Sequence, residues 1–448
     1  MTISIYDTMS RSLREFVPLE EGKVKMYVCG PTVYNYIHIG NARSVVSFDT
    51  IRRYFEYRGF EVTYISNFTD VDDKIIKGAA EAKMDTKAFA DKFIKAFRED
   101  VSKLGVKPAT VHPRVIDYMD QIIAFVADLI AKGYAYESSG DVYFRVAKAK
   151  DYAKLANKTL EDLELGASGR VDAETELKEN PVDFALWKAA KPGEVSWDSP
   201  WGAGRPGWHI ECSVMATELL GDTIDIHGGG ADLEFPHHTN EIAQSEAKTG
   251  QTFANYWMHN AMLNIDNEKM SKSLGNFVTA HDMLEKVDGQ VLRFFLATQH
   301  YRRPLNYTDK AVQDAEINLK YLKNAYTQDF TDQADLGKWQ SLKADFVQAM
   351  DDDFNTANGI TTVFDMAKFI NSGNYNQTIK EEFAAILAVF GIVFETEVLD
   401  EEIEALIAER QDARAKRDFA TADRIRDELA AQGIKLLDTK DGVRWIRD

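Results

Sequence analysis

One segment, residues 23–67, constrains the fold of this chain more than any other. Residues 23–29 (KVKMYVC) alternate between apolar and polar side chains, which is the period of a β-strand. A turn-rich connection follows, and residues 41–59 then show the period of a helix. The apolar positions that share one face of this helix are Val45, Phe48, Ile51 and Phe55. Because residues 61–67 (EVTYISN) again have strand composition, the order strand, glycine turn, helix, strand predicts the start of a parallel α/β sheet.

The remaining chain changes character along its length. Residues 86–135 are helical in pattern, whereas residues 137–205 combine a short strand, a polar run and many Trp, Gly and Pro residues, which indicates an insertion. Strand composition returns in TIDIHGGGADL, and a helical pattern follows in HHTNEIAQSEAKTG. Beyond about residue 305 the pattern is helical, with amphipathic segments at 309–327, 337–350, 356–371 and 379–391. The tail from residue 396 predicts one charged helix and then a hairpin.

Length and composition limit the class of protein. A chain of 448 residues accommodates two or three domains of roughly 150 residues. The first residues lack the apolar core of a signal peptide, and no stretch approaches the ~18 apolar residues that span a bilayer, so we expect a cytoplasmic protein without a membrane segment. The net charge of −19 argues against non-specific coating of nucleic acid, but a local basic face could still bind RNA.

The two cysteines of the chain, Cys29 and Cys212, allow three interpretations. They lie 183 positions apart (212 − 29), unlike the close pairs of a zinc finger. A disulfide is disfavoured because cytoplasmic thiols stay reduced, which leaves two inert buried thiols or a shared metal. His237 and Glu241 have i, i+4 spacing, which on a helix places them on one face, and imidazole, carboxylate and thiolate are all zinc ligands. The same spacing fits a surface hydrogen bond, and His238 is interpreted as a core or supporting residue.

Three motifs suit a nucleotide. HIGN, residues 38–41, comes after a strand and opens a helix, where Gly40 permits close approach and the helix N-terminus favours negative charge. KMSKS, residues 269–273, adds two ammonium groups and two hydroxyls that suit the charge developing on pyrophosphate. In HGGGADL, residues 227–233, the glycines permit approach of a base or sugar, and Asp232 could accept from ribose hydroxyls. Each motif alone also occurs as a solvated loop or a turn without a ligand.

Together these segments resemble the class I aminoacyl-tRNA synthetases, in which HIGH and KMSKS signatures flank an ATP site on a Rossmann-like fold. More narrowly, YVCGPTVYNYIHIGNAR, NFTDVDDKI, GRPGWHIECS, IHGGGADLEFPHHTNEIAQSEA and EKMSKSLGNF, in this order, resemble the cysteinyl-tRNA synthetase family along nearly the whole chain. The resemblance implies an α/β fold whose parts are a Rossmann-like parallel-sheet catalytic domain (1–115 and 206–304), a connective insertion (116–205), a helical bundle that contacts the tRNA stem (305–395) and a small C-terminal anticodon-binding domain (396–448).

The resemblance also implies an activity. L-cysteine and ATP are expected to give cysteinyl adenylate and pyrophosphate, after which the cysteinyl group moves to the terminal adenosine of tRNA(Cys). The implied cofactors are Mg²⁺ with ATP and one Zn²⁺ per monomer, with the zinc ligands Cys29, Cys212, His237 and Glu241. A hydrophobic pocket gains only ~1–3 kcal/mol from the one-atom difference between cysteine and serine. A metal instead tests the acidity of the thiol, whose pKa is ~8.5.

Further site residues are carried over from the matching motifs. The catalytic residues are expected to be His38, Lys269 and Lys272, with Lys272 as the main phosphate contact. The ATP contacts are expected to be His38, Gly40, Asn41, Gly229, Asp232, Lys269, Ser271, Lys272 and Ser273. The amino-acid contacts are expected to be Cys29, Thr69, Trp208 and His227. Trp208 is assigned to the substrate side chain, although a tryptophan in this motif also fits plain core, and Thr69 and His227 are assigned to the amino and carboxylate groups.

Three positions carry further expectations. Asn41 stands where the HIGH signature ends in His, so the phosphate contact of this position is less defined, and Thr239 stands where the family has Glu, away from the ligand positions. Because four protein ligands normally close a zinc site, Glu241 is expected to be loosely held when the substrate thiolate binds.

The C-terminal residues imply an RNA partner, since adenylate chemistry needs only residues 1–304. Trp445 is expected to stack on an anticodon base. Basic residues gather on the predicted tail helix, although solvated i, i+4 ion pairs explain each one singly: Arg410, Arg414, Lys416, Arg417, Arg424 and Arg426. One alternative is the related cysteine ligase of thiol-cofactor (mycothiol-type) synthesis, against which residues 396–448 argue. Another is a non-catalytic, zinc-stabilised RNA-binding protein, against which the KMSKS motif argues.

Overall fold

The structure is a computed structural model that describes residues 2–159, 177–270, 275–331, 334–394, 401–431, 434–439 and 442–447. The chain forms two compact units, Met1–Val393 and Phe394–Asp448. Each unit contains a hydrophobic cluster of its own.

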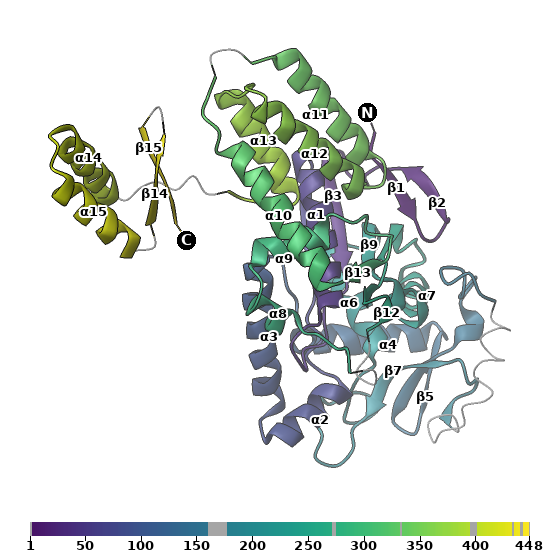
Figure 1. The fold of residues 1–448 in the computed structure, drawn as a ribbon. Coiled ribbons are helices and arrows are strands. Elements are labelled where there is room, and N and C mark those ends of the chain that lie inside the picture. Colours follow the sequence, from purple (N-terminus) through teal and green to yellow (C-terminus); the bar gives the residue numbers. More distant parts are fainter. Residues whose placement is uncertain are drawn as a thin grey trace. The chain divides into compact units, whose positions relative to one another are not determined.

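The first unit is organised around a four-stranded parallel sheet with the order β10-β9-β3-β4 (Figure 1). Its strands are β3 (Lys23–Val28), β4 (Glu61–Ile65), β9 (Ile224–Gly230) and β10 (Ala254–Asn260). β3 pairs in parallel with β4 on one side and with β9 on the other, so the strand order reverses between β3 and β9. Ligands of open α/β sheets bind beyond the carboxyl ends of the strands at such a reversal.

Helix α1 (Ile39–Tyr57) follows β3, as the sequence predicts, and begins two residues earlier than expected. The side chain of His38 caps it by accepting a hydrogen bond from the Asn41 backbone amide at 3.1 Å. Phe48 packs so closely on the sheet that a Cβ on Gly228 would lie 2.4 Å from its ring. The three predicted core positions Phe48, Ile51 and Phe55 are buried, whereas Val45 is only half-buried.

The helical stretch expected over 86–135 is instead divided. α2 (Asp73–Ala82) and α3 (Thr86–Lys103) form a pair, and α4 (Met119–Ala131) follows after a separate loop. The range is largely helical, as predicted, but a loop interrupts it because Gly105 has a φ of +64° and Pro108 and Pro113 cannot continue a helix.

The region interpreted as an insertion contains an antiparallel sheet, β5-β6-β7-β8. Its strands are β5 (Ala135–Ser138), β6 (Asp141–Phe144), β7 (Phe184–Ala189) and β8 (Gly204–Pro206). α6 (Trp208–Leu220) leads the chain back to the central sheet, and α7 (Thr239–Thr249) lies between β9 and β10 in the chain. Buried Phe144 and Trp187 of the insertion belong to the same hydrophobic cluster as Cys212 of α6.

The rest of the first unit is mostly helical. A small sheet with the order β12-β11-β13 contains β11 (Leu263–Ile265), β12 (Glu268–Lys269) and β13 (Leu305–Tyr307), and the short helices α8 (Ala280–Leu284) and α9 (Gly289–Ala297) lie between β12 and β13. The four amphipathic segments predicted after residue 305 are helices α10 (Asp309–Tyr326), α11 (Leu336–Asp351), α12 (Thr356–Asn371) and α13 (Gln377–Val389). They gather at the end of the unit opposite the insertion (Figure 1). An N-terminal hairpin, β1 (Ser4–Asp7) and β2 (Ser12–Glu15), is not predicted by the sequence pattern.

The second unit corrects the prediction of a single tail helix. It contains two helices, α14 (Glu401–Ala415) and α15 (Phe419–Ala431), and Arg417 between them has the left-handed φ of 61°. The predicted hairpin is confirmed as β14 (Ile434–Thr439) paired with β15 (Gly442–Arg447).

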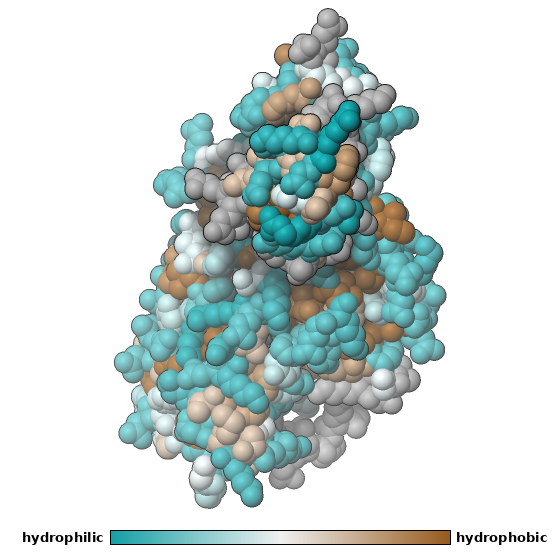
Figure 2. Space-filling view, turned by 60° about the vertical axis from the view of Figure 1, so that its left-hand side comes forward, coloured by the Kyte–Doolittle hydropathy of each residue, from teal (hydrophilic) through white to brown (hydrophobic). Residues whose placement is uncertain are grey.

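The surface in Figure 2 is mainly hydrophilic, with hydrophobic residues in separate patches. Within the described ranges, none of the helices combines the length and apolar composition needed to cross a membrane.

Candidate active site and metal centre

A cavity of about 460 Å³ lies where β3 and β9 end. Its lining combines the segment after β3, the start of α1, the start of α6 and the β11–β12 region. Seven of the predicted site residues line it: Cys29, His38, Gly40, Asn41, Trp208, Asp232 and Lys269. Residues from both halves of the sheet therefore meet at the point where the strand order reverses.

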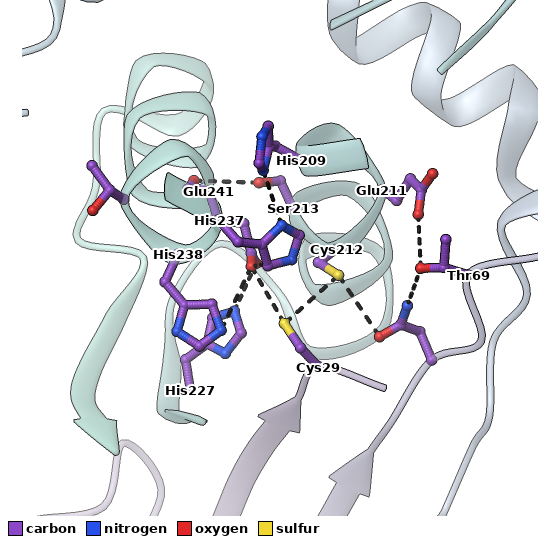
Figure 3. Close-up of polar contacts among 12 residues, drawn as sticks. Cys29, Thr69, His209, Glu211, Cys212, Ser213, His227, His237, His238 and Glu241 are labelled. Carbon is purple, nitrogen blue, oxygen red and sulfur yellow. Dashed lines mark hydrogen bonds and ion pairs between the residues drawn. The ribbon is translucent and has the colours of Figure 1, made fainter. Parts of the chain in front are cut away.

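The four predicted metal ligands converge beside this cavity, which Cys29 lines (Figure 3). The Sγ atom of Cys29 lies 3.8 Å from Cys212 Sγ and 3.4 Å from Glu241 Oε1. His237 Nε2 lies 3.0 Å from the same Glu241 oxygen. Cys212, His237 and Glu241 are 2%, 1% and 0% exposed, so the surface hydrogen bond that the i, i+4 spacing also allowed does not describe this pair.

Different elements position these ligands. Cys29 follows β3 directly, and its backbone amide extends the sheet by donating to the Gly228 carbonyl at 3.1 Å. Cys212 lies on α6, and Glu241 lies in the first turn of α7. The prediction that His237 shares a helix with Glu241 needs correction, because α7 begins at Thr239 and His237 lies in the preceding π-helical turn η5 (Glu234–His238).

The donor atoms fit a single zinc ion. Around a tetrahedral zinc with Zn–S bonds of about 2.3 Å, two sulfur atoms lie about 3.8 Å apart, and a sulfur and a carboxylate oxygen about 3.6 Å apart. The corresponding distances here are 3.8 Å and 3.4 Å. Both cysteines are free thiols, and two sulfurs, an imidazole and a carboxylate form a set of zinc ligands.

The electrostatics of the metal-free cluster favour ionisation of Cys212 and Glu241 but keep protons on Cys29 and His237, and zinc would have to displace these protons. A hydrogen bond with Cys29 lowers the pKa of Cys212 to about 6, whereas burial raises the pKa of the Cys29 thiol. Burial opposes ionisation of Glu241, but His227 and His237 hold its pKa well below the ordinary value. Burial likewise opposes protonation of His237, yet Glu241 and Cys212 raise its pKa to about 10. Without a metal, protons thus occupy the position that a cation would take.

Two further histidines lie behind Glu241. His227 Nε2 lies 2.6 Å from Glu241 Oε2, and His238 Nδ1 lies 2.8 Å from His259 Nε2. Together with Cys29 and Glu241, His227 and His238 form a second group of closely spaced donors. Both histidines are fully buried, as expected for His238, and neither lines the cavity. The contact of His227 with the substrate stays a prediction, since in the structure this residue holds the Glu241 carboxylate.

The remaining predicted amino-acid contacts are Trp208 and Thr69. The Trp208 ring is 39% exposed and stacks on His237 with 4.4 Å between ring centroids, so it forms a cavity wall and is not plain core. Thr69 is buried, and its hydroxyl donates to Glu211 Oε2 at 3.0 Å (Figure 3).

Sequence reasoning missed three residues that support these contacts. Asn67 Oδ1 accepts a hydrogen bond from the Gly30 backbone amide at 2.9 Å, and the Asn67 amide group donates to Thr69 Oγ1 at 3.4 Å. Glu211 accepts from Thr69, and His209 Nδ1 lies 3.0 Å from His237 Nδ1, where it can fix the orientation of the His237 ring. The available signal was proximity in sequence, because GWHIECS places His209 and Glu211 beside Cys212.

The HIGN segment lies beside the described start of the KMSKS motif, residues 269 and 270, and beside the segment that follows the motif. The Ile39 amide donates to the Val278 carbonyl at 3.1 Å, and the Ala280 amide donates to the Ile37 carbonyl at 2.8 Å. A Cβ on Gly40 would lie 2.9 Å from His38 Nδ1 and 3.5 Å from Met270 Cε, so this position leaves little room for a side chain and favours glycine. Lys269 lies on β12, and the predicted contacts Ser271, Lys272 and Ser273 lie outside the described residues.

The HGGGADL motif has two parts. Gly228 and Gly229 belong to β9 and not to a turn, and a Cβ on Gly229 would lie 2.8 Å from Leu233 and 3.0 Å from His238. Close protein packing therefore accounts for these glycines. Gly230 and Asp232 line the cavity, whereas Gly229 does not, and its ATP contact stays a prediction.

The tail has the ion pairs of a solvated helical surface. Lys416 pairs with Asp412, Arg424 with Glu428, and Arg426 with Asp423, at 2.5, 3.3 and 3.1 Å. Arg410 is buried, whereas the other five basic residues named above are exposed. The backbone of Trp445 lies opposite Leu436 in the hairpin. Its stacking on a base stays a prediction, because the Trp445 side chain is not among those that the structure describes.

A parallel sheet whose switch-point cavity is lined by the HIGN segment and by Lys269 and Met270 at the start of KMSKS is the arrangement of the class I aminoacyl-tRNA synthetase fold. Solved structures agree with this class. The methionyl-tRNA synthetase of Mycobacterium tuberculosis in complex with methionyl-adenylate has a TM-score of 0.59 at 14% identity, over 82% of this chain and 89% of that chain. A putative arginyl-tRNA synthetase of Campylobacter jejuni has a TM-score of 0.54 at 13% identity, over 86% and 96%.

The chain belongs to the cysteine–tRNA ligase family. The tRNA synthetases class I (C) catalytic domain matches residues 15–317, the DALR domain residues 345–395, and the cysteinyl-tRNA ligase anticodon binding domain residues 396–445. Cysteine–tRNA ligases of Streptococcus agalactiae and Streptococcus thermophilus are 76% and 75% identical over 446 residues, with 100% of each chain covered. The match to an anticodon binding domain does not favour the alternative of a thiol-cofactor ligase.

Proposed function

We propose that this chain joins L-cysteine to tRNA(Cys) in two steps. In the first step, a carboxylate oxygen of cysteine attacks the α-phosphate of ATP and pyrophosphate leaves. In the second step, a hydroxyl of the terminal adenosine attacks the acyl carbon and AMP leaves. The observation that carries the proposal is one cavity lined by Cys29 of the zinc-donor cluster, by His38, Gly40 and Asn41 of HIGN, and by Lys269 of KMSKS.

The amino-acid end selects the substrate. Cys29, Cys212, His237 and Glu241 would hold zinc, which, when bound, favours a thiolate ligand over a neutral hydroxyl. Trp208 closes one side of the pocket by stacking on His237. The buried Thr69 hydroxyl is fixed by Glu211 and Asn67, and this orientation suits a contact with the polar groups of the amino acid.

Glu241 is the ligand that we expect to exchange most readily. Its Oε2 atom already has a buried partner, His227 Nε2, at 2.6 Å. The carboxylate would therefore remain hydrogen-bonded after loosening its contact with the metal, so this change leaves no unpaired buried charge. A zinc absorption spectrum that shows no additional Zn–S bond when cysteine is added would contradict this expectation.

The nucleotide end stabilises the leaving pyrophosphate. Because His38 Nδ1 accepts from the Asn41 amide, the neutral ring carries its proton on Nε2, which can then donate to a phosphate oxygen. Gly40 and Asn41 present the N-terminus of α1 to the same cavity, where its dipole favours an anion. Lys269, with Lys272 of the KMSKS motif, is expected to supply the positive charge as ATP reacts with its Mg²⁺.

We also propose that the protein acts as a cytoplasmic monomer with one zinc ion per chain. Light scattering of the purified protein should give the mass of one chain, and atomic absorption should give one equivalent of zinc.

The function is tested by cysteine-dependent ATP–pyrophosphate exchange and by charging of tRNA(Cys), each with cysteine and with serine. We expect both reactions with cysteine and neither at a comparable rate with serine. An amino sugar offered in place of tRNA serves as the control acceptor. Transfer to the sugar and not to tRNA would replace the proposal with the thiol-cofactor ligase, and binding of tRNA without pyrophosphate exchange would indicate a non-catalytic protein.

A further inference from the structure

A lysine with no assigned role lines the active-site cavity. Lys74 lies in the first turn of α2, within the TDVDDK motif. Its ammonium group lies 5.2 Å from the centroid of the Tyr34 ring, and Tyr34 lines the same cavity. Such a cation–π contact directs the ammonium without neutralising it.

The acidic residues around Lys74 contact groups other than its ammonium. Asp70 pairs with Arg114 at 2.7 Å, and Asp72 caps α2 by accepting from the backbone amide of Lys74 at 2.8 Å. Asp73 pairs with Arg205 and lies 3.8 Å from the ammonium of Lys188. In the part of the chain that the structure describes, no carboxylate forms an ion pair with Lys74. Its full charge is therefore available to a ligand in the cavity.

The position of Lys74 differs from that of the other lysines in the cavity lining. Asp73, the preceding residue, contacts the insertion through Lys188 of β7 and Arg205 of β8, and β8 leads directly to Trp208 at the amino-acid end. Lys269 instead lies on β12, beside the HIGN segment. The third lysine, Lys107, pairs with Glu56. Lys74 is thus an unpaired cation on the insertion side of the cavity.

We propose that Lys74 binds a backbone phosphate next to the terminal adenosine of the tRNA and so positions that nucleotide for the second step. The inference rests on the proposed function. Pyrophosphate leaves toward the KMSKS side, so a phosphate on the insertion side belongs to the acyl acceptor and not to ATP. A lysine ammonium is a suitable point charge for one phosphodiester, and the Tyr34 ring keeps it extended over the cavity.

The test separates the two steps in the full-length enzyme. Lys74→Met retains the apolar stem and removes the charge, and Lys74→Arg retains the charge. Lys77→Met is the matched control, because Lys77 lies on the same helix, does not line the cavity, and is 79% exposed beside Glu81. Each variant is assayed for cysteine-dependent pyrophosphate exchange, for single-turnover transfer from preformed adenylate to tRNA, and for the salt dependence of tRNA affinity.

We expect Lys74→Met to leave the exchange rate within about twofold of the parent rate and to slow transfer about tenfold, since one charge-assisted contact is lost. The slope of log affinity against log salt should fall by about 0.7, the value for one single-strand phosphate contact. Lys74→Arg should retain most of the transfer rate, and Lys77→Met should match the parent in all three assays. A lysine with only a structural role would not change the salt slope.

Three results would overturn the inference. Equal losses in exchange and transfer would assign Lys74 to ATP, an unchanged salt slope would remove the phosphate contact, and a similar effect of Lys77→Met would indicate a general effect of charge. Failure of the parent enzyme to catalyse exchange would contradict the proposed function itself, and the assay shows this before any variant is compared.

Discussion

The two ends of the cavity are built in opposite ways. At the amino-acid end, Cys212, His237 and Glu241 are at most 2% exposed, and Cys212 belongs to a hydrophobic cluster of the first unit. At the nucleotide end, Lys269 is exposed on a two-residue strand, and Met270 is only half-buried.

The difference reflects what each end must distinguish. A choice between thiol and hydroxyl depends on a fixed set of donors in a dry environment, where an unpaired charge is costly. A contact with phosphates depends on cations that can adjust as negative charge develops on the leaving pyrophosphate. Long side chains near water can make this adjustment. Substitutions at the amino-acid end should therefore remove activation altogether, whereas those at the nucleotide end should reduce its rate.

The largest effect is expected from Cys212→Ala. Loss of a ligand should lower zinc affinity by more than the ~10–100-fold that outer-partner changes cause, and cysteine-dependent exchange should fall to background. Zinc content and exchange are measured on the same preparation. The control is Ser213→Ala, which removes a neighbouring buried hydroxyl but no ligand. A Cys212→Ala enzyme that retains zinc and activity would show that the cluster is not the selective element.

Lys272→Ala should have the next largest effect. Loss of a cation that stabilises pyrophosphate should slow adenylate formation by more than about tenfold, while zinc content stays at one per chain. Lys269→Ala provides the comparison at a described position. An exchange rate that stays at the parent level would exclude Lys272 from the mechanism.

Arg43→Met tests the support of the nucleotide end. Arg43 is fully buried, and its guanidinium donates to the carbonyls of Ala261 and Met262 at 3.0 and 2.7 Å and to those of His300 and Arg303. These residues precede β11 and β13, and β11 pairs both with β13 and with β12, the Lys269 strand. Burial lowers the pKa of Arg43 to about 10. Unpaired carbonyls should lower the free energy of unfolding by about 2–4 kcal/mol.

In activity, Arg43→Met should raise the KM for ATP more than the KM for cysteine. Arg43→Lys should recover only part of the loss, since one ammonium cannot reach all four carbonyls. Urea unfolding and the two KM values check these expectations. An equal rise in both KM values would show that Arg43 does not distinguish the two ends.

The smallest effect is expected from the pH dependence of Asp353, which holds the same region. Its carboxylate accepts from the Tyr6 amide, the Tyr301 hydroxyl and Arg302 at 2.8, 2.7 and 2.6 Å. Burial opposes ionisation, but these contacts and His300 lower the pKa of Asp353 below 3.8. The ionised form therefore stabilises the fold fully above about pH 4, and this contribution is lost as pH falls through the folded pKa.

Asp353→Asn should accordingly be less stable than the parent at neutral pH, with the difference shrinking below about pH 4. Urea unfolding over this range measures it. A stability difference between Asp353→Asn and the parent that is independent of pH would show that the Asp353 charge contributes nothing to stability.

Much of the catalytic fold was predictable from local patterns. The alternation in residues 23–29 and the periodicity of residues 41–59 gave β3 and α1, and the amphipathic segments gave α10 to α13. Local patterns failed where the break between two helices is not marked by a Gly or Pro residue. The charged run from residue 401 contains no Gly or Pro before the break at Arg417, so it resembles one helix although it forms two.

The metal cluster could not be derived from spacing, because its cysteines are 183 positions apart and meet only in the fold, where α6 holds Cys212 beside Cys29 at the end of β3. Family resemblance supplied the ligands, and the structure supplied their distances. Arg43, Asn67 and Lys74 were missed for a related reason. Each acts through contacts with residues distant in sequence, and nothing in its local pattern separates it from an ordinary polar residue.

The most direct test of the account measures bound zinc and pyrophosphate exchange on one preparation, with cysteine and with serine, before chelation, after it and after zinc is restored. We predict one zinc per chain, loss of exchange on chelation and recovery with zinc. Serine should react more slowly than cysteine by a larger factor than the ~10–200-fold that a hydrophobic pocket provides. A metal-free enzyme with full activity, or serine activation within that range, would contradict selection through the Cys29, Cys212, His237 and Glu241 cluster.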